Sequence, residues 1–123
     1  KNFKIKKVKS IKLSSNSSNV NIEELEDTGI LSGNFGELNI ARVGANFKNL
    51  DINLENSDLE LGLPSSAFNF MYSGTQSDIK HPGSLKVTSS ESYDNKKLTG
   101  FHKTKDSGGN ISIQANFSDV LLN

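Results

Sequence analysis

Carboxylate side chains recur at one repeated position of this sequence. Glu37, Asp58, Asp78 and Asp119 each follow a small residue and precede an apolar one, and Asn19 takes the same place in an earlier segment. Stacked copies of one segment would bring these side chains into a column along one edge. Hard cations such as Ca²⁺ take several oxygen ligands, and paired carboxylates can hydrolyse glycosidic bonds. The column is therefore the first candidate for a binding surface.

Turn chemistry explains the same residues without a ligand. Asp and Asn at turns accept hydrogen bonds from backbone N–H groups and tolerate unusual dihedral angles. The glycine-rich pattern of calcium-binding repeats does not occur in the sequence, so we expect neither a metal site nor a cofactor. The four acidic residues stay as candidate binding residues.

The residue patterns of common enzymes are missing. There is no Cys and no Gly-x-Ser-x-Gly, and the two histidines, His81 and His102, lie far apart in sequence, so no nucleophile with its base is indicated. The phosphate-binding glycine patterns are also missing, and Gly108-Gly109 precedes a strand-like segment instead of opening a helix. We therefore expect no catalytic residues, with a polysaccharide-active enzyme as the alternative.

Few aromatic side chains are free to stack on a ligand in this interpretation. Phe35 and Phe117 share one repeat position, and the aromatic residues of 68–72 alternate along one strand, so we interpret them as turn or core residues. Phe101 and His102 stand side by side in a polar segment. This pair has no such explanation, and we add it to the candidate binding residues.

The elements that would position these side chains follow from an internal repeat of about 20 residues, a period typical of stacked repeat architectures. Aligned segments have apolar residues at Val20, Leu38, Leu59, Ile79 and Val120. The first four are almost evenly spaced, and the last interval is about twice as long as the others. Small residues precede these positions by two: Ser18, Gly36, Ser57, Ser77 and Ser118. Apolar residues alternate with polar ones on both sides of the small residue, which is typical of half-buried strands joined by a turn.

A strand-turn-strand unit cannot bury its apolar face alone, but stacked copies bury a continuous core. The sequence therefore predicts an all-β fold, a short parallel β-solenoid (β-helix) of about five to six rungs, in which equivalent residues form columns. An antiparallel β-sandwich is the alternative. Residues 82–107 break the repeat, and we expect an insertion or a degenerate rung there.

The length of the chain favours one domain over residues 1–123. The formal net charge is +0, but six lysines lie in residues 1–12, where they alternate with apolar residues. Lysines in this pattern protect a sheet edge, and without stacking aromatics we expect no nucleic-acid binding. No apolar run reaches the length of a membrane span. The sequence begins with Lys and shows no signal peptide, so we expect either a processed chain or a domain of a longer, exported chain.

Several phrases resemble the adhesin domains of Gram-negative envelope proteins: GNFGELNI, NSDLELGLP, AFNF, LTGF and GGNISIQANFSDVLL, within residues 30–123. In that family, repeats end in a Gly/Ser-Asp-Val/Leu/Ile turn before a short strand. The resemblance implies a β-solenoid that is exported to the periplasm, the outer-membrane surface or the extracellular space. It also implies adhesion to a protein or glycan partner and supplies no catalytic residues. The Lys-rich opening and residues 88–107 depart from the family pattern.

The sequence thus predicts a non-enzymatic surface module that binds a protein or a glycan, without insertion into a membrane. A polysaccharide-active enzyme on a β-helix and a structural spacer or assembly module are the alternatives.

Overall fold

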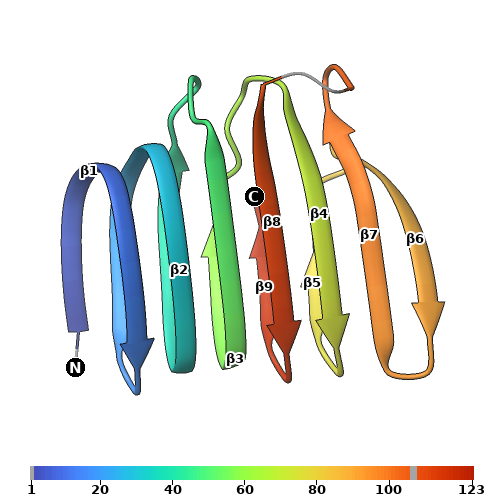
Figure 1. Ribbon diagram of the computed structural model, residues 1–123, viewed down its shortest axis with the longest axis horizontal. Helices are drawn as coiled ribbons and strands as arrows, with labels where there is room; N and C mark the ends of the chain where they lie inside the picture. The colour runs from blue at the N-terminus through green and yellow to red at the C-terminus, as the bar shows by residue number, and fades with distance from the viewer. Residues whose placement is uncertain (1, 106–107) are drawn as a thin grey trace.

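The computed structural model describes residues 2–105 and 108–123, which coil through two layers of strands (Figure 1). A tight turn at the lower edge of Figure 1 joins the two layers in each rung. The strands are β1 (Asn2–Asn16), β2 (Asn19–Val43), β3 (Asn49–Leu61), β4 (Phe68–Thr75), β5 (Asp78–Lys80), β6 (Lys86–Ser92), β7 (Asn95–His102), β8 (Gly109–Asn116) and β9 (Asp119–Leu122).

Strands β1, β2 and β3 are long because each bends from one layer into the other. The first layer holds the segments before the turns: 10–16, 28–34, 49–55, 109–116 and 68–75, followed by β7 and β6. The second layer holds the segments 2–8, 19–25, 37–43, 58–61, 119–122 and 78–80. These six second-layer segments agree with the five to six rungs expected from the repeat.

Most strand pairs are parallel, which confirms the predicted β-solenoid. The pairs β1–β2, β2–β3, β3–β8, β4–β8, β3–β9 and β5–β9 are parallel, and the antiparallel pairs are β4–β7 and β6–β7. The antiparallel β-sandwich is therefore wrong for the body of the fold. Strand β1 lies at one edge of the sheet, as its lysine pattern predicts.

The order of the rungs in space differs from their order in sequence. Leu38 pairs with Leu59, Leu59 with Val120, and Val120 with Ile79. The predicted column therefore exists, but the rung formed by β8 and β9 lies between the rung of β3 and that of β4 and β5. The interval between Ile79 and Val120 is long because β4, β5 and the β6–β7 hairpin come before β8 and β9 in the sequence, although β8 and β9 lie between β3 and β4–β5 in space.

In the segment 82–107, expected as an insertion or a degenerate rung, residues 106–107 lie outside the described residues, and the described part contains an antiparallel hairpin. β7 pairs with β4 at the far end of the first layer, and β6 pairs with β7. Leu85 and Leu98 are buried and attach this hairpin to the core. The hairpin therefore extends the first layer of the coil without forming another parallel rung.

The core lies between the two layers and follows the period-2 pattern of the strands. In β3, Leu50, Ile52, Leu54, Leu59 and Leu61 are at most 2% exposed. The residues that alternate with them on each side of the turn are half-buried or exposed, and Ser57 at the turn is buried. Successive side chains of a strand point to opposite faces, so this alternation places every outer residue in a row across the rungs.

The turns require a small residue for a structural reason. The residue before it has a positive φ of 46–55° in each rung: Ser17, Phe35, Asn56, Gln76 and Phe117. Ser57 N–H donates to Ser118 Oγ, and Ser118 N–H donates to Ser77 Oγ, both at 3.0 Å. At Gly36 a Cβ atom would overlap the carbonyl oxygen of Ser18. The position is thus occupied by glycine or serine, and the hydroxyls of Ser118 and Ser77 bond to a neighbouring rung.

None of the residues that the structure describes belongs to a helix long and apolar enough to cross a membrane.

Candidate functional site

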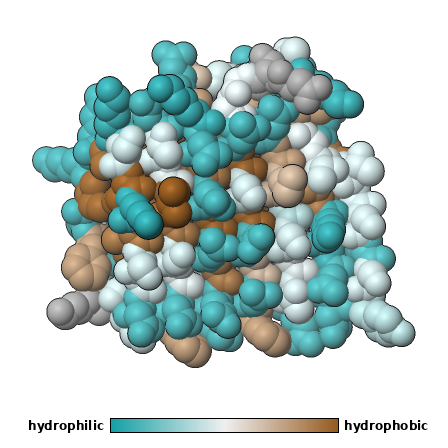
Figure 2. All heavy atoms as spheres, viewed as in Figure 1, coloured by the Kyte–Doolittle hydropathy of each residue, from teal (hydrophilic) through white to brown (hydrophobic). Residues whose placement is uncertain are grey.

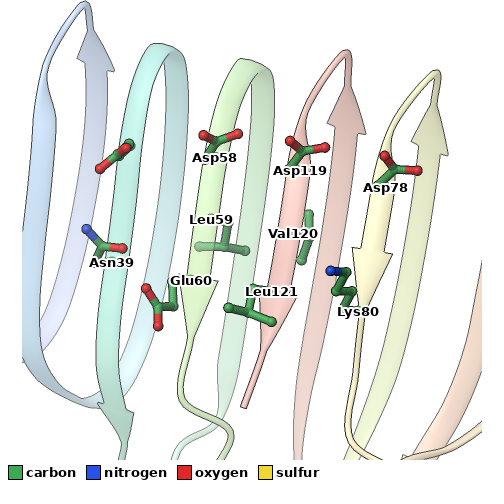
Figure 3. Close-up of a pocket in the computed structure, with 10 residues that line it drawn as sticks. Asn39, Asp58, Leu59, Glu60, Asp78, Lys80, Asp119, Val120 and Leu121 are labelled. Carbon is green, nitrogen blue, oxygen red and sulfur yellow. The ribbon is translucent and has the colours of Figure 1, made fainter.

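The four acidic candidates form one row on the outer surface of the second layer. Glu37 pairs with Asp58, Asp58 with Asp119, and Asp119 with Asp78. Each is the first or second residue after its turn, and each is exposed. Neighbouring strands lie about 4.8 Å apart, so consecutive carboxylates are one strand spacing from each other. We call these four residues the acidic row (Figure 3).

A second row of outer side chains runs beside the acidic row, two residues further along each strand. Asn39 pairs with Glu60, Glu60 with Leu121, and Leu121 with Lys80. The two rows line a shallow surface hollow of about 400 Å³ (Figure 3). Leu121, which is 39% exposed, adds an apolar side chain to the floor of this hollow. Lys80 places a positive charge at one end of it.

The hollow continues into a neighbouring depression toward β1. Asn39, Glu37 and Glu60 line both hollows, and Asn21 and Glu23 extend the second. Asn39 Nδ2 donates to Asn21 Oδ1 at 2.9 Å, which fixes both amides across neighbouring rungs. The two hollows are thus continuous across the outer surface of the second layer.

Among the described residues, the acidic row has no compensating charge in direct contact. The ion pairs within residues 2–105 and 108–123 join Lys7 to Glu24 and Glu26, Arg42 to Glu24, and Lys96 to Glu91. Like charges placed opposite each other on neighbouring strands destabilise a sheet. The row therefore works against the stability of the coil that carries it.

The carboxylates are arranged in a line and do not converge on a point. Within the described part of the chain, no group of three or more His, Cys, Asp or Glu residues is placed to hold a metal ion. Side chains at one register of parallel strands leave the sheet in the same direction, so their oxygens cannot surround a cation. The geometry is that of a charged strip.

Tyr72 lies in the core behind this strip. Its side chain is completely buried, and burial raises the pKa of its hydroxyl, with the charges of Asp78 and Asp119 raising it further and the nearby Ser77 lowering it. The Ser77 hydroxyl itself donates to the Thr75 carbonyl at 2.9 Å. Within the part of the chain that the structure describes, Tyr72 Oη has no hydrogen-bond partner, although the Ser77 hydroxyl lies near it.

Phe101 and His102, the other predicted binding residues, lie in β7 and away from the acidic row. The His102 ring stacks on Phe68 with centroids 5.4 Å apart, and its Nδ1 is 3.4 Å from the Ser84 carbonyl oxygen. Phe101 points to the opposite side of β7, where it lines a hollow of about 490 Å³ with Met71. The structure thus brings the four acids together and separates them from this pair.

Two sets of residues were missed or only partly understood from the sequence. The second outer row contains four different kinds of side chain, at Asn39, Glu60, Leu121 and Lys80. In the sequence these residues share only their position, two residues after each member of the acidic row. Phe35 and Phe117, interpreted as turn or core residues, lie at turns and are 59% and 56% exposed. A place in the core is therefore wrong for these two side chains.

Comparisons with protein-family models, with curated protein sequences and with solved structures found no match to this chain.

Proposed function

We propose that this chain is a non-enzymatic binding module of an exported cell-envelope or cell-surface protein, and that its acidic row holds a positively charged segment of a partner protein. Export and a role in adhesion are part of the proposal and rest on the resemblance of GNFGELNI and GGNISIQANFSDVLL to adhesin domains.

One observation carries the binding role: four consecutive rungs present uncompensated carboxylates at one register. The fold does not need these charges, because the turns are held by the serine and glycine positions beside them. A partner that supplies lysine or arginine would relieve the repulsion between the carboxylates. Of the two partner classes expected from the sequence, protein and glycan, the acidic row favours a basic protein segment.

The test is the affinity for a short Lys/Arg-rich peptide, measured by fluorescence anisotropy at low and high salt. The isosteric triple variant Asp58→Asn, Asp119→Asn, Asp78→Asn should bind roughly tenfold more weakly, since each exposed ion pair contributes about 0.2–1 kcal/mol. Binding by the native chain should weaken as salt rises, because exposed charges are screened.

A matched control separates this surface from the overall charge. The variant Asp51→Asn, Glu55→Gln, Glu91→Gln also removes three negative charges, but from the first layer and the hairpin. It should retain most of the affinity. Equal losses in the two triple variants would contradict a defined site and leave only attraction by net charge.

The two alternatives predict different results in simple assays. A polysaccharide-active enzyme would turn over a member of a glycan panel and lose this activity in the Asp78→Asn, Asp119→Asn variant. A spacer would assemble through its unpaired edge strand β1, since open edges template further pairing. Light scattering that rises with protein concentration, without binding of the basic peptide, would favour the spacer.

A further inference from the structure

A row of aromatic side chains runs along the turn edge of the coil, apart from the acidic row. The turn residues with positive φ occur in the spatial order Ser17, Phe35, Asn56, Phe117 and Gln76. The turn of the β6–β7 hairpin lies next to Gln76 and places Tyr93 on the same edge, because Gln76 N–H donates to the Asp94 carbonyl. From Phe35 onward, aromatic and amide side chains therefore alternate.

Three aromatic side chains on this edge are exposed. Phe35 and Phe117 are 59% and 56% exposed, and Tyr93 is fully exposed. Apolar side chains protrude along the lower edge of the molecule in Figure 2. Phe35 and Phe117 are separated by the single rung of Asn56, so they lie about 9.6 Å apart, twice the strand spacing.

Folding alone does not favour aromatic residues at these turns. A φ of 55° at Phe35, 51° at Phe117 or 52° at Tyr93 is uncommon for a bulky residue, while asparagine adopts it more readily. Asn56 shows that the turn accepts asparagine. An exposed aromatic ring at these positions also does not contribute the free energy that its burial would provide. Strained, exposed residues that the fold does not need point to a functional role.

We propose that this turn edge binds an extended, uncharged β-1,4-linked polysaccharide. In such a chain every second sugar presents the same ring face, and this repeat has about the length of two rungs. Phe35 and Phe117 stack on alternate sugars, Tyr93 stacks on a sugar further along the chain, and the amides of Asn56 and Gln76 hydrogen-bond to hydroxyl groups between them. The Gln76 amide is already oriented, since its Nε2 donates to Asp94 Oδ2 at 3.1 Å.

The charges near the edge select against other ligands with flat, stackable groups. The acidic row begins two residues beyond the aromatic positions, at Glu37 and Asp119. These carboxylates repel phosphates and uronates, so a nucleic acid or an acidic glycan is disfavoured at this edge. The site is separate from the peptide-binding surface proposed above and does not depend on it.

The experiment measures binding of cellohexaose and chitohexaose by titration calorimetry, with α-linked maltohexaose as the comparison. The variants Phe35→Asn and Phe117→Asn copy Asn56 at the same turn position and should fold at least as stably as the native chain. We expect each to weaken binding of a β-linked hexaose roughly tenfold, the scale for loss of an anchoring aromatic. The double variant should lose measurable binding, while Phe35→Tyr should retain it.

Controls distinguish this site from adsorption and from the acidic row. Met71 is equally exposed, at 56%, but lies on the outer face of β4, so Met71→Asn should leave binding unchanged. The acidic-row triple variant should also retain glycan binding. No binding of either β-linked hexaose, equal binding of maltohexaose, or full binding by the double variant would overturn the proposal. The proposal would also be overturned if the double variant lost the binding of a protein partner but kept the binding of the glycan.

Discussion

At the scale of single residues, Tyr72 links the core to the charges on the surface. Its ring is completely buried, and a Cβ atom on Gly74 would overlap its hydroxyl. The hydroxyl has no hydrogen-bond partner among the described residues, and both burial and the neighbouring carboxylates oppose its ionisation. The residue is therefore stable in the fold only as the neutral phenol.

Stability at alkaline pH should report on this residue. The pKa of Tyr72 is raised above its usual value of 10.0 in the folded chain, so the unfolded chain releases this proton first. Its contribution to stability is complete below pH 10 and is lost as pH rises toward the folded pKa. Tyr72→Phe should match the native chain within about 1 kcal/mol at pH 7 and lose less stability by pH 11 in urea unfolding.

Tyr93 provides the control for this measurement, because its side chain is fully exposed. Tyr93→Phe should show the same alkaline loss of stability as the native chain. An alkaline loss that Tyr72→Phe leaves unchanged would place its origin in other groups.

At the scale of elements, the turn decides which residues can occupy the repeated position. The serine hydroxyls accept a backbone N–H from the next rung and donate to a carbonyl two residues back, as Ser118 Oγ does to Asn116 at 2.9 Å. This ladder joins three rungs in the spatial order Ser57, Ser118 and Ser77. It continues the backbone pairing through a turn that would otherwise interrupt it.

Ser118→Ala should be one of the more damaging single substitutions on a turn. The change leaves the Ser57 N–H without its acceptor, and an unsatisfied buried donor costs about 1–3 kcal/mol. Ser10→Ala, at an exposed position of β1, should change stability by less than about 0.5 kcal/mol. Urea midpoints of the two variants compare the effects, and similar midpoints would show that water replaces the lost acceptor.

The turn also explains how much of the fold could be predicted from the sequence. A positive φ followed by a small residue, with alternating apolar residues on both sides, is a local pattern, so the columns and the acidic row were predicted correctly. Pairing between distant segments has no such local signal. Strand β6 has almost no apolar alternation, with most of its residues exposed, and its hairpin with β7 was not anticipated. The sequence could not indicate that β8 pairs with both β3 and β4.

At the scale of the whole molecule, the central position of β8 and β9 distinguishes this coil from a simple stack. β8 pairs with β3 on one side and β4 on the other, and β9 pairs with β3 and β5. Ile111, Ile113, Val120 and Leu122 from these strands are buried. The two halves of the molecule therefore meet through a rung that comes later in sequence than either.

Truncation of the chain should show that the two halves depend on β8 and β9. Removal of residues 109–123 eliminates the only strands that join β3 to β4 and β5 within the described structure, and the remaining chain should lose cooperative unfolding and dispersed amide resonances. Removal of residues 1–9 takes away half of an edge strand and should leave a folded, less stable protein. A well-dispersed spectrum for the chain without 109–123 would mean that β3 and β4 can pair directly.

The central position of β8 and β9, which are the last strands in the sequence, also sets the order in which the fold can form during synthesis. The rungs of β1, β2 and β3 can pair one after another as they leave the ribosome, because each finds its neighbour already made. Strands β4 and β5 emerge before their parallel partners β8 and β9 exist, so until then β4 can pair only with β7 of the hairpin. A nascent chain arrested before residue 109 should therefore be protected from protease as far as the end of β3 and remain cleavable beyond it.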